Sequence, residues 1–350
     1  MVAIAAVGLA VPGAVPTAPP ARAACGPTFN DPLPDTPWPL RRLRPDLVWP
    51  ITRGAGVVVA VIDSGVSGAH PSLVGQVRDG LDLLAPETRG HCDESGHGTM
   101  IAGIIAGRVT PSSGFHGMAP LASILPIRVL RDEQRNFDDE APRRIATAIR
   151  WAVDHEAKVI NLSLVTERTP ELDAAVRYAQ ERDVVLVAAA GNDGAGPRGP
   201  APYPAAYPGV IAVAGVDEQG ARVATSTTGD HVDIAAPGWN IHGPAPNGTG
   251  YVVRPEGGTS FAAAYVTGTV ALLRAYRTDL DAESVIRRVL RTADDPAGGW
   301  DPEVGHGVVN PYWAITSIVS SVEETPAPPG AVAAPEIRPD PMRGVRLVAV

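Results

Sequence analysis

Five nearly continuous apolar segments alternate with segments of helical periodicity, and this alternation limits the folds open to the chain. The apolar segments are residues 57–62, 124–130, 158–164, 184–190 and 210–216. The helical segments are residues 98–106, 141–155, 170–182, 261–277 and 282–291. Strands that are apolar on both sides are typical of a parallel sheet covered by helices on both faces. The sequence therefore predicts an α/β fold whose ligand sites lie at the carboxyl ends of the strands.

The composition fits one large domain with additional segments at its ends. The chain has 350 residues, of which 45% are hydrophobic, so it can bury a full core. Its net charge is −9 at pH 7 and it has no basic cluster, which argues against a nucleic-acid partner. Prolines gather near both ends, which indicates that the ends are separate from the central domain.

Three side chains stand where this fold presents ligand-binding residues. Asp63 follows the first apolar segment, His97 lies in a Gly-His-Gly-Thr turn, and Ser260 opens the longest helical segment. A serine hydroxyl needs an adjacent base, an imidazole can carry its proton, and a carboxylate can orient the imidazole. Each residue alone has an ordinary alternative role as a cap or loop residue. Together they predict a nucleophile (Ser260), a base (His97) and an orienting acid (Asp63).

Asn192 supplies a fourth part of this chemistry. It follows the apolar segment 184–190, which predicts an amide at the end of a buried strand. The Asn192 side chain and the Ser260 N–H would then stabilise an oxyanion, and losing such a donor costs about 10²–10³ in rate. The alternative is that Ala-Gly-Asn-Asp-Gly is simply a turn.

The four segments together resemble the subtilisin-type serine proteases, the subtilases, over about residues 50–315. The matching segments are residues 61–66, 96–103, 189–192 and 258–262, with weaker matches at 117–120, 161–164, 203–217 and 236–238. The order Asp, His, Ser along the chain is the order of that family. The resemblance implies a subtilisin-like parallel sheet and a substrate bound as an extended strand. The substrate-binding segments would be Ser163, Leu164 and Val165 on one side and Ala189, Ala190 and Gly191 on the other.

Two residues depart from the pattern of the family. Ala264 stands where many subtilases have proline, and alanine is the better helix former. Val165 stands where subtilases commonly have glycine, next to the backbone that pairs with the substrate. We expect its β-branched side chain to crowd a subsite and restrict substrate choice.

The N-terminal residues predict export. Residues 2–15 are apolar and uncharged, and Ala21-Arg22-Ala23 is a signal-peptidase pattern, so residues 1–23 are predicted to be a signal peptide. The positively charged start of such a signal is missing, so we expect the true start to lie upstream of Met1. The alternative is an apolar tail.

The only two cysteines, Cys25 and Cys92, are compatible with a disulfide in an exported protein. Their bridge would staple an N-terminal extension, residues 24–49, onto the domain near His97, and would stabilise the fold by about 4 kcal/mol. The alternative is two free thiols. His91 and Cys92 precede Asp93 and Glu94, a pattern that suggests a metal site. No second ligand pair complements them, so we expect no metal and no cofactor.

The stapled extension, the sequence after Ser260 and the proline-rich tail are similar to those of the mycosins, the subtilases of type VII secretion systems in actinobacteria. This resemblance implies an extension wrapped around a catalytic domain, residues 50–320. It also implies a linker, residues 321–350, leading to a transmembrane anchor. The final apolar run is too short to span a bilayer, so either the anchor follows Val350 or the enzyme is unanchored.

The sequence thus predicts an exported serine endopeptidase that acts on a protein or peptide, with the membrane-embedded type VII secretion complex as a further partner. Two alternatives remain: a protease that matures a peptide precursor, and a structural subunit of a secretion complex whose proteolysis is secondary. The remaining histidines match no catalytic motif and are expected to be structural or at the surface. They are His70, His91, His116, His155, His231, His242 and His306.

Overall fold

The computed structural model describes residues 25–111, 113–132, 138–194, 196, 201–296 and 299–318. The chain divides into two units, residues 1–317 and 318–350, and the first contains every element named below. The predicted signal peptide and the predicted linker lie outside the described residues. No helix in the described part of the chain is long and apolar enough to cross a membrane.

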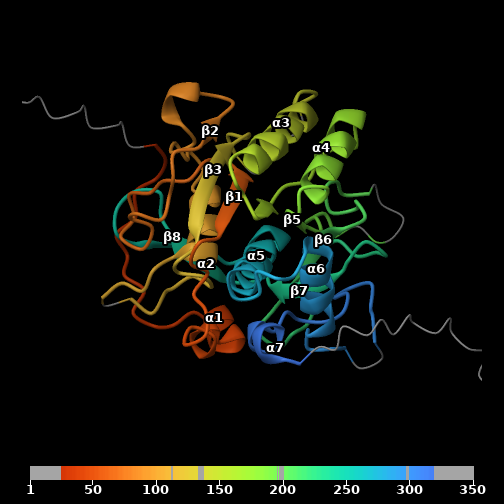
Figure 1. Cartoon of the computed structure of the whole chain (residues 1–350). Helices are drawn as coiled ribbons and strands as arrows, with labels where there is room; N and C mark the ends of the chain where they lie inside the picture. Colours follow the sequence, from red (N-terminus) through yellow and green to blue (C-terminus); the bar gives the residue numbers. More distant parts are fainter. Residues whose placement is uncertain are drawn as a thin grey trace, which may run out of the picture. The chain divides into compact units, whose positions relative to one another are not determined.

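A seven-stranded sheet forms the centre of the first unit (Figure 1). Its strands are β1 (Val58–Asp63), β2 (Leu81–Asp82), β3 (Ser123–Arg128), β4 (Val159–Leu162), β5 (Val185–Ala189), β6 (Val210–Val216) and β7 (Ile234–Pro237). Their order is β2-β3-β1-β4-β5-β6-β7, and all neighbours are parallel. The order reverses at β1, which lies between β3 and β4. Doubly wound sheets hold their ligands at the carboxyl end of such a switch point.

Helices cover both faces of the sheet. They are α1 (Trp38–Leu43), α2 (His97–Ala106), α3 (Ala141–Asp154), α4 (Pro170–Gln180), α5 (Thr259–Tyr276), α6 (Ala282–Arg291) and α7 (Pro311–Thr316), with 3₁₀ turns at Pro45–Leu47 and Pro86–Thr88. A separate antiparallel hairpin joins β8 (Ile241–Pro244) and β9 (Tyr251–Arg254).

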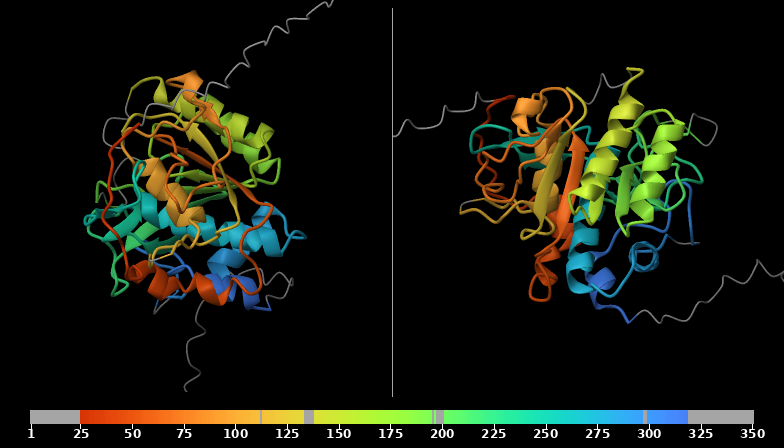
Figure 2. Two further views of the ribbon diagram at one scale, coloured as in Figure 1. Left: turned by 90° about the vertical axis from the view of Figure 1, so that its left-hand side faces the viewer. Right: turned by 45° about the horizontal axis from the view of Figure 1, so that its top comes forward.

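Alternate side chains of each strand enter two different cores, as the period of two in a strand requires. Val59 and Val61 of β1 pack with α2 and α5, whereas Ala60 and Ile62 pack with α3 and α4. Figure 2 shows α3 and α4 side by side on their face of the sheet. All ten residues of α2 are buried, which explains why its sequence lacks a polar side. The predicted α/β fold with a parallel sheet and helices on both faces is confirmed.

The predicted segments correspond to β1, β3, β4, β5, β6 and to α2, α3, α4, α5, α6, with most ends moved by one or two residues. Helix α2 begins at His97 and α5 at Thr259, so both catalytic candidates lie inside the first turn of their helices. The sequence did not predict β2, β7, the β8–β9 hairpin, α1 or α7. These elements are only two to six residues long, which is too short for hydrophobic periodicity to reveal them.

The N-terminal extension lies against the catalytic domain. Cys25 and Cys92 form a disulfide in the structure. The extension also pairs with the hairpin, since Gly250 donates to the Phe29 carbonyl (2.9 Å) and Tyr251 to the Asp31 carbonyl (3.1 Å). At its far end, Leu40 and Leu43 of α1 enter the core. The extension is therefore anchored at both ends and in between.

Candidate active site

Asp63 and His97 join the end of β1 to the start of α2. His97 Nδ1 lies 2.7 Å from Asp63 Oδ1, and both side chains are buried. The same oxygen accepts a hydrogen bond from the Ser64 N–H (2.7 Å). A carboxylate that accepts from Nδ1 selects the tautomer in which Nε2 is the basic nitrogen. The geometry is therefore that of an imidazole oriented by an acid.

A second buried carboxylate, Asp93, holds the first turn of α2. Its Oδ1 accepts from the Gly96 N–H (2.8 Å) and lies 2.8 Å from Ser64 Oγ. Its Oδ2 accepts from the N–H (2.8 Å) and the hydroxyl (2.6 Å) of Thr99. Such N–H groups at a helix start have no partner within the helix. Burial raises the pKa of Asp93, and the bonds from Thr99 and Ser64 oppose that shift. Asp93 thus fixes the helix end that carries His97.

Gly98 allows this helix end to approach β1. A Cβ at position 98 would lie 2.1 Å from the Gly65 carbonyl oxygen and 3.2 Å from Asp63 Oδ1. Any side chain here would push α2, and His97 with it, away from the carboxylate. The second glycine of the Gly-His-Gly motif is therefore required because a side chain at position 98 would not fit between α2 and β1.

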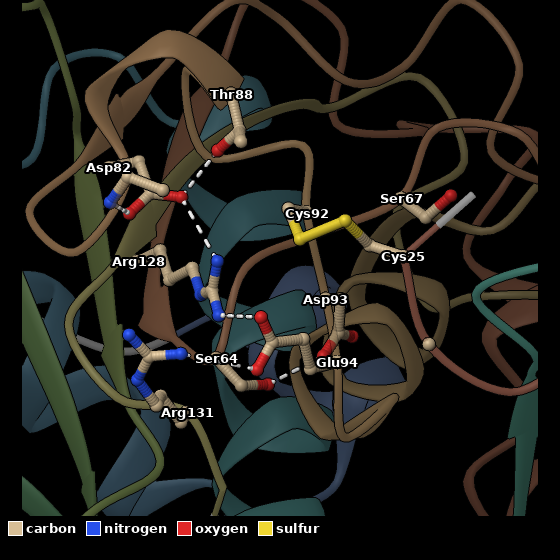
Figure 3. The surroundings of a disulfide bond; sticks show 12 residues. Cys25, Ser64, Ser67, Asp82, Thr88, Cys92, Asp93, Glu94, Arg128 and Arg131 are labelled. Carbon is tan, nitrogen blue, oxygen red and sulfur yellow. Dashed lines mark hydrogen bonds and ion pairs between the residues drawn. A yellow bond between two sulfur atoms is a disulfide. The ribbon is translucent and has the colours of Figure 1, made fainter. Parts of the chain in front are cut away.

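The segment between the disulfide and His97 is also held from its other side. Arg128 lies at the end of β3 and is buried. Its guanidinium nitrogens lie 3.4 Å from a carboxylate oxygen of Asp82 and 2.9 Å from one of Glu94 (Figure 3). The guanidinium of Arg131 lies 3.7 Å from the other carboxylate oxygen of Glu94. Cys92 and Glu94 flank Asp93 in the sequence. The disulfide and these ion pairs therefore immobilise the segment that delivers the Asp93 carboxylate.

Ser260 lies in the first turn of α5 and contacts the residues after β4. Its hydroxyl donates to the Ser163 carbonyl (3.2 Å), and Ser163 Oγ lies 2.9 Å from the Ser260 carbonyl oxygen. Ser163 Oγ also lies 2.8 Å from the amide oxygen of Asn161, whose Nδ2 donates to the hydroxyl of Thr267 on α5 (2.9 Å). These bonds fix the distance between α5 and the end of β4.

Asn192 is exposed just after β5 and is oriented by Thr259. Its Oδ1 accepts from the N–H (2.8 Å) and the hydroxyl (2.9 Å) of Thr259. Because the oxygen of the amide is held on that side, the NH₂ group points the other way, and Asn192 lines the cavity described next. The N–H of Ser260, at the start of α5, is one of the groups that a helix itself leaves without a partner.

A cavity of about 820 Å³ brings these residues together. Its described lining residues are His97, Ser163, Leu164, Val165, Thr166, Glu167, Ala189, Gly191, Asn192, Asp193, Ala201, Pro202, Thr227, Arg254, Glu256, Gly257, Gly258, Ser260 and Phe261. Asp63 lies behind His97, out of contact with solvent. No described residue of the extension lines the cavity. Ser260, His97 and Asn192 therefore share one open cleft at the carboxyl ends of the strands.

Comparison with known proteins identifies the family. Residues 54–307 match the subtilase family, peptidase S8. The chain belongs to the subtilases. Subtilases are serine endopeptidases, so this chain is one as well.

Two relatives and one solved structure place this subtilase within its family. Thermitase from Thermoactinomyces vulgaris is 37% identical over 277 residues, which cover 79% of this chain and 94% of thermitase. Mycosin-1 from Mycolicibacterium smegmatis is 35% identical over 366 residues, which cover 90% of this chain and 80% of that protein. A chain of the periplasmic assembly from the ESX-5 inner membrane complex has a TM-score of 0.74 and 29% identity. That match covers 91% of this chain and 97% of the other.

Five of the six residues predicted to bind substrate line the cleft of this subtilase: Ser163, Leu164, Val165, Ala189 and Gly191. Ala190 does not line it. Its side chain is buried among residues of β6 and β7, and its N–H donates to the Val213 carbonyl (3.0 Å). Two facts bear on the alternative metal site. Cys92 is bonded to Cys25, and no group of three or more His, Cys, Asp or Glu among the described residues is arranged to hold a metal ion.

Several supporting residues were not predicted from the sequence: Ser64, Asp93, Thr259 and the charged residues of the cleft. Asp93 had a usable signal, because an acid shortly before a helical segment is typical of a residue that caps it. Thr259 had none, because its partner Asn192 is 67 residues away.

Proposed function

We propose that this subtilase is an exported endopeptidase of the mycosin type, which hydrolyses peptide bonds with Asp63, His97 and Ser260. One observation carries the proposal: a buried His97–Asp63 pair, with atoms 2.7 Å apart, opens onto the same cleft as Ser260 and Asn192. Four side chains from four separate segments meet there. Their types are those that acyl transfer by a serine requires.

In the proposed mechanism, Ser260 Oγ attacks the carbonyl carbon of the scissile bond. His97 takes the hydroxyl proton at Nε2 and then gives it to the leaving amine, while Asp63 stabilises the imidazolium. Asn192 Nδ2 and the Ser260 N–H donate hydrogen bonds to the oxyanion. Water repeats the sequence on the acyl-enzyme, and the acid product leaves with Ser260 restored.

The substrate would bind as an extended strand between two segments that line the cleft, residues 163–165 after β4 and residues 189–191 at the end of β5. Main-chain hydrogen bonds give such binding its affinity, and side-chain pockets give its specificity. In the second segment the contacts fall to Ala189 and Gly191, since Ala190 pairs with β6.

The mycosin assignment is supported by similarity to mycosin-1 and to a chain in the ESX-5 periplasmic assembly. The disulfide is typical of a protein that works outside the cytoplasm. We therefore place the enzyme on the outer side of the membrane, at a type VII secretion complex. The ESX-5 neighbour also favours a second role, as a structural subunit of that complex.

The test of the catalytic proposal is covalent labelling with a fluorophosphonate probe. We expect purified wild type to be labelled at Ser260, and Ser260→Ala to be unlabelled and inactive on a casein substrate. Ser284→Ala is the matched control, since Ser284 lies on α6, away from the cleft, and its labelling should equal that of wild type. Unlabelled wild type would contradict the proposal, because the described extension leaves the cleft open.

Complementation of a deletion strain in the native host distinguishes the catalytic role from the structural role. If secretion fails on deletion but is restored by both wild type and Ser260→Ala, the structural role dominates. Restoration by wild type alone shows that proteolysis is required.

A further inference from the structure

Arg254 is the one lysine or arginine among the described residues that line the cleft. It is the last residue of β9, and its side chain is partly buried. Its Nε is buried without a hydrogen-bond partner, and it forms no ion pair within the described part of the chain. The Arg254 guanidinium therefore lines the cleft without an ion-pair partner among the described residues.

The buried arginines among the described residues have a carboxylate or carbonyl partner, although the Nε atoms of Arg128 and Arg274 are likewise buried without a hydrogen-bond partner. Arg128 lies against Asp82 and Glu94, Arg274 lies 2.9 Å from Asp183, and Arg288 donates to the Ala314 carbonyl (2.5 Å). Burying a guanidinium nitrogen such as the Arg254 Nε without such a partner costs free energy. A substrate group that reaches Arg254 would supply such a partner. The flat guanidinium fork suits a carboxylate.

The position of β9 indicates which part of the substrate reaches Arg254. The β8–β9 hairpin packs on α2, since a Cβ on Gly243 of β8 would lie 3.1 Å from the Met100 side chain (Figure 1). Helix α2 carries His97, which delivers its proton to the leaving amine. The segments proposed above to bind the extended substrate, residues 163–165 and 189–191, lie instead at the ends of β4 and β5, and we assign them to the acyl side. Arg254 therefore lies on the leaving-group side.

We propose, resting on the protease function above, that Arg254 is a specificity-determining residue that binds an aspartate or glutamate side chain just after the scissile bond. The other charged residues of the cleft also favour an acidic side chain after the scissile bond over one before it. Glu167 and Asp193 follow β4 and β5, so they disfavour an acidic residue on the acyl side. Glu256 lies near Arg254 in sequence, is exposed, and forms no ion pair with it among the described contacts. We expect the Glu256 carboxylate to weaken the attraction of Arg254 for an acidic side chain.

The test uses internally quenched peptides that differ only at the first two positions after the cleaved bond, with Glu, Gln or Lys there. The cleaved bond is located by mass spectrometry, and kcat/KM is measured for each peptide. A hydrogen-bonded charge pair implies that wild type prefers Glu over Gln about tenfold. Arg254→Gln should lose this preference, so that its ratio of kcat/KM for the Glu peptide over the Gln peptide falls toward one. Glu256→Gln should increase the preference. High salt should reduce it in wild type.

Two further variants keep the result interpretable. Arg291→Gln removes an exposed arginine outside the cleft and should leave the preference unchanged. Arg254→Lys keeps the charge without the fork and should retain part of the preference, which covers the case in which Arg254→Gln does not fold. If wild type cleaves no peptide, the protease proposal is at fault. If wild type cleaves Glu and Gln peptides equally, or Arg254→Gln keeps the preference, Arg254 has no such role.

Discussion

The two halves of the cleft are held in place by different means. On one side, Asp63 and His97 are fixed by buried side-chain hydrogen bonds among residues 63–64 and 93–99. On the other, Ser260 and Asn192 are fixed by bonds that join segments 97 and 67 residues apart. The first half depends on a few local side chains. The second depends on how α5 sits against the ends of β4 and β5.

This difference determines how each half should respond to mutation. A local side-chain network fails when one member changes its hydrogen-bonding character, because buried polar groups then lose their partners. A half built on long-range contacts tolerates the loss of one bond, because packing of the buried α5 keeps its position. Substitutions on the two sides therefore test the comparison directly.

The largest effect is expected from Asp63→Asn. The amide keeps the shape of the carboxylate but stabilises the wrong tautomer of His97, so kcat should fall about 10⁴-fold. KM should change little, because Asp63 lies behind His97 and does not line the cleft. Steady-state kinetics on one peptide substrate measures both constants.

Asp93→Asn is the matched control for that variant. It also converts a buried aspartate, but one whose hydrogen bonds join it to Ser64, Gly96 and Thr99. An amide cannot accept on both sides, so the free energy of unfolding should fall by about 1–3 kcal/mol. Its kcat should fall far less than that of Asp63→Asn. Equal losses of kcat in the two variants would contradict a direct role for Asp63.

The sequence predicts the reacting side chains of both halves, but not the residues that hold them, such as Ser64 and Asp93 in the first half and Thr259 in the second. Asp63, His97 and their glycines are close to strand or helix ends that hydrophobic periodicity reveals. Asn192 and Ser260 were found because each also ends or begins such a segment. The bond from Thr259 to Asn192 and the placement of Arg254 in the cleft could not be predicted. Both depend on how a hairpin and a helix pack against distant strands, which no local pattern encodes.

The second prediction concerns Asn192→Ala. Loss of one oxyanion donor should lower kcat by about 10²–10³-fold with little change in KM. Thr259→Val keeps the Asn192 side chain and the Thr259 N–H bond but removes the hydroxyl that orients the amide. Its kcat should fall much less, since one of two bonds remains. If Thr259→Val is as impaired as Asn192→Ala, then this half is as fragile as the other and the comparison fails.

The smallest effect is expected from Val165→Gly, which changes selectivity and leaves the catalytic groups intact. Val165 lines the cleft beside the backbone proposed to pair with the substrate, and removing its branched side chain opens a subsite. One or two methylene groups of space are worth about tenfold in kcat/KM, so substrates with larger side chains should gain by that factor. A peptide library profiled for cleavage measures this, with Val109→Gly as the control at an exposed position outside the cleft. An unchanged profile would show that the Val165 side chain does not limit substrate choice. A gain confined to large residues before the scissile bond would place the acyl side along β4, opposite Arg254.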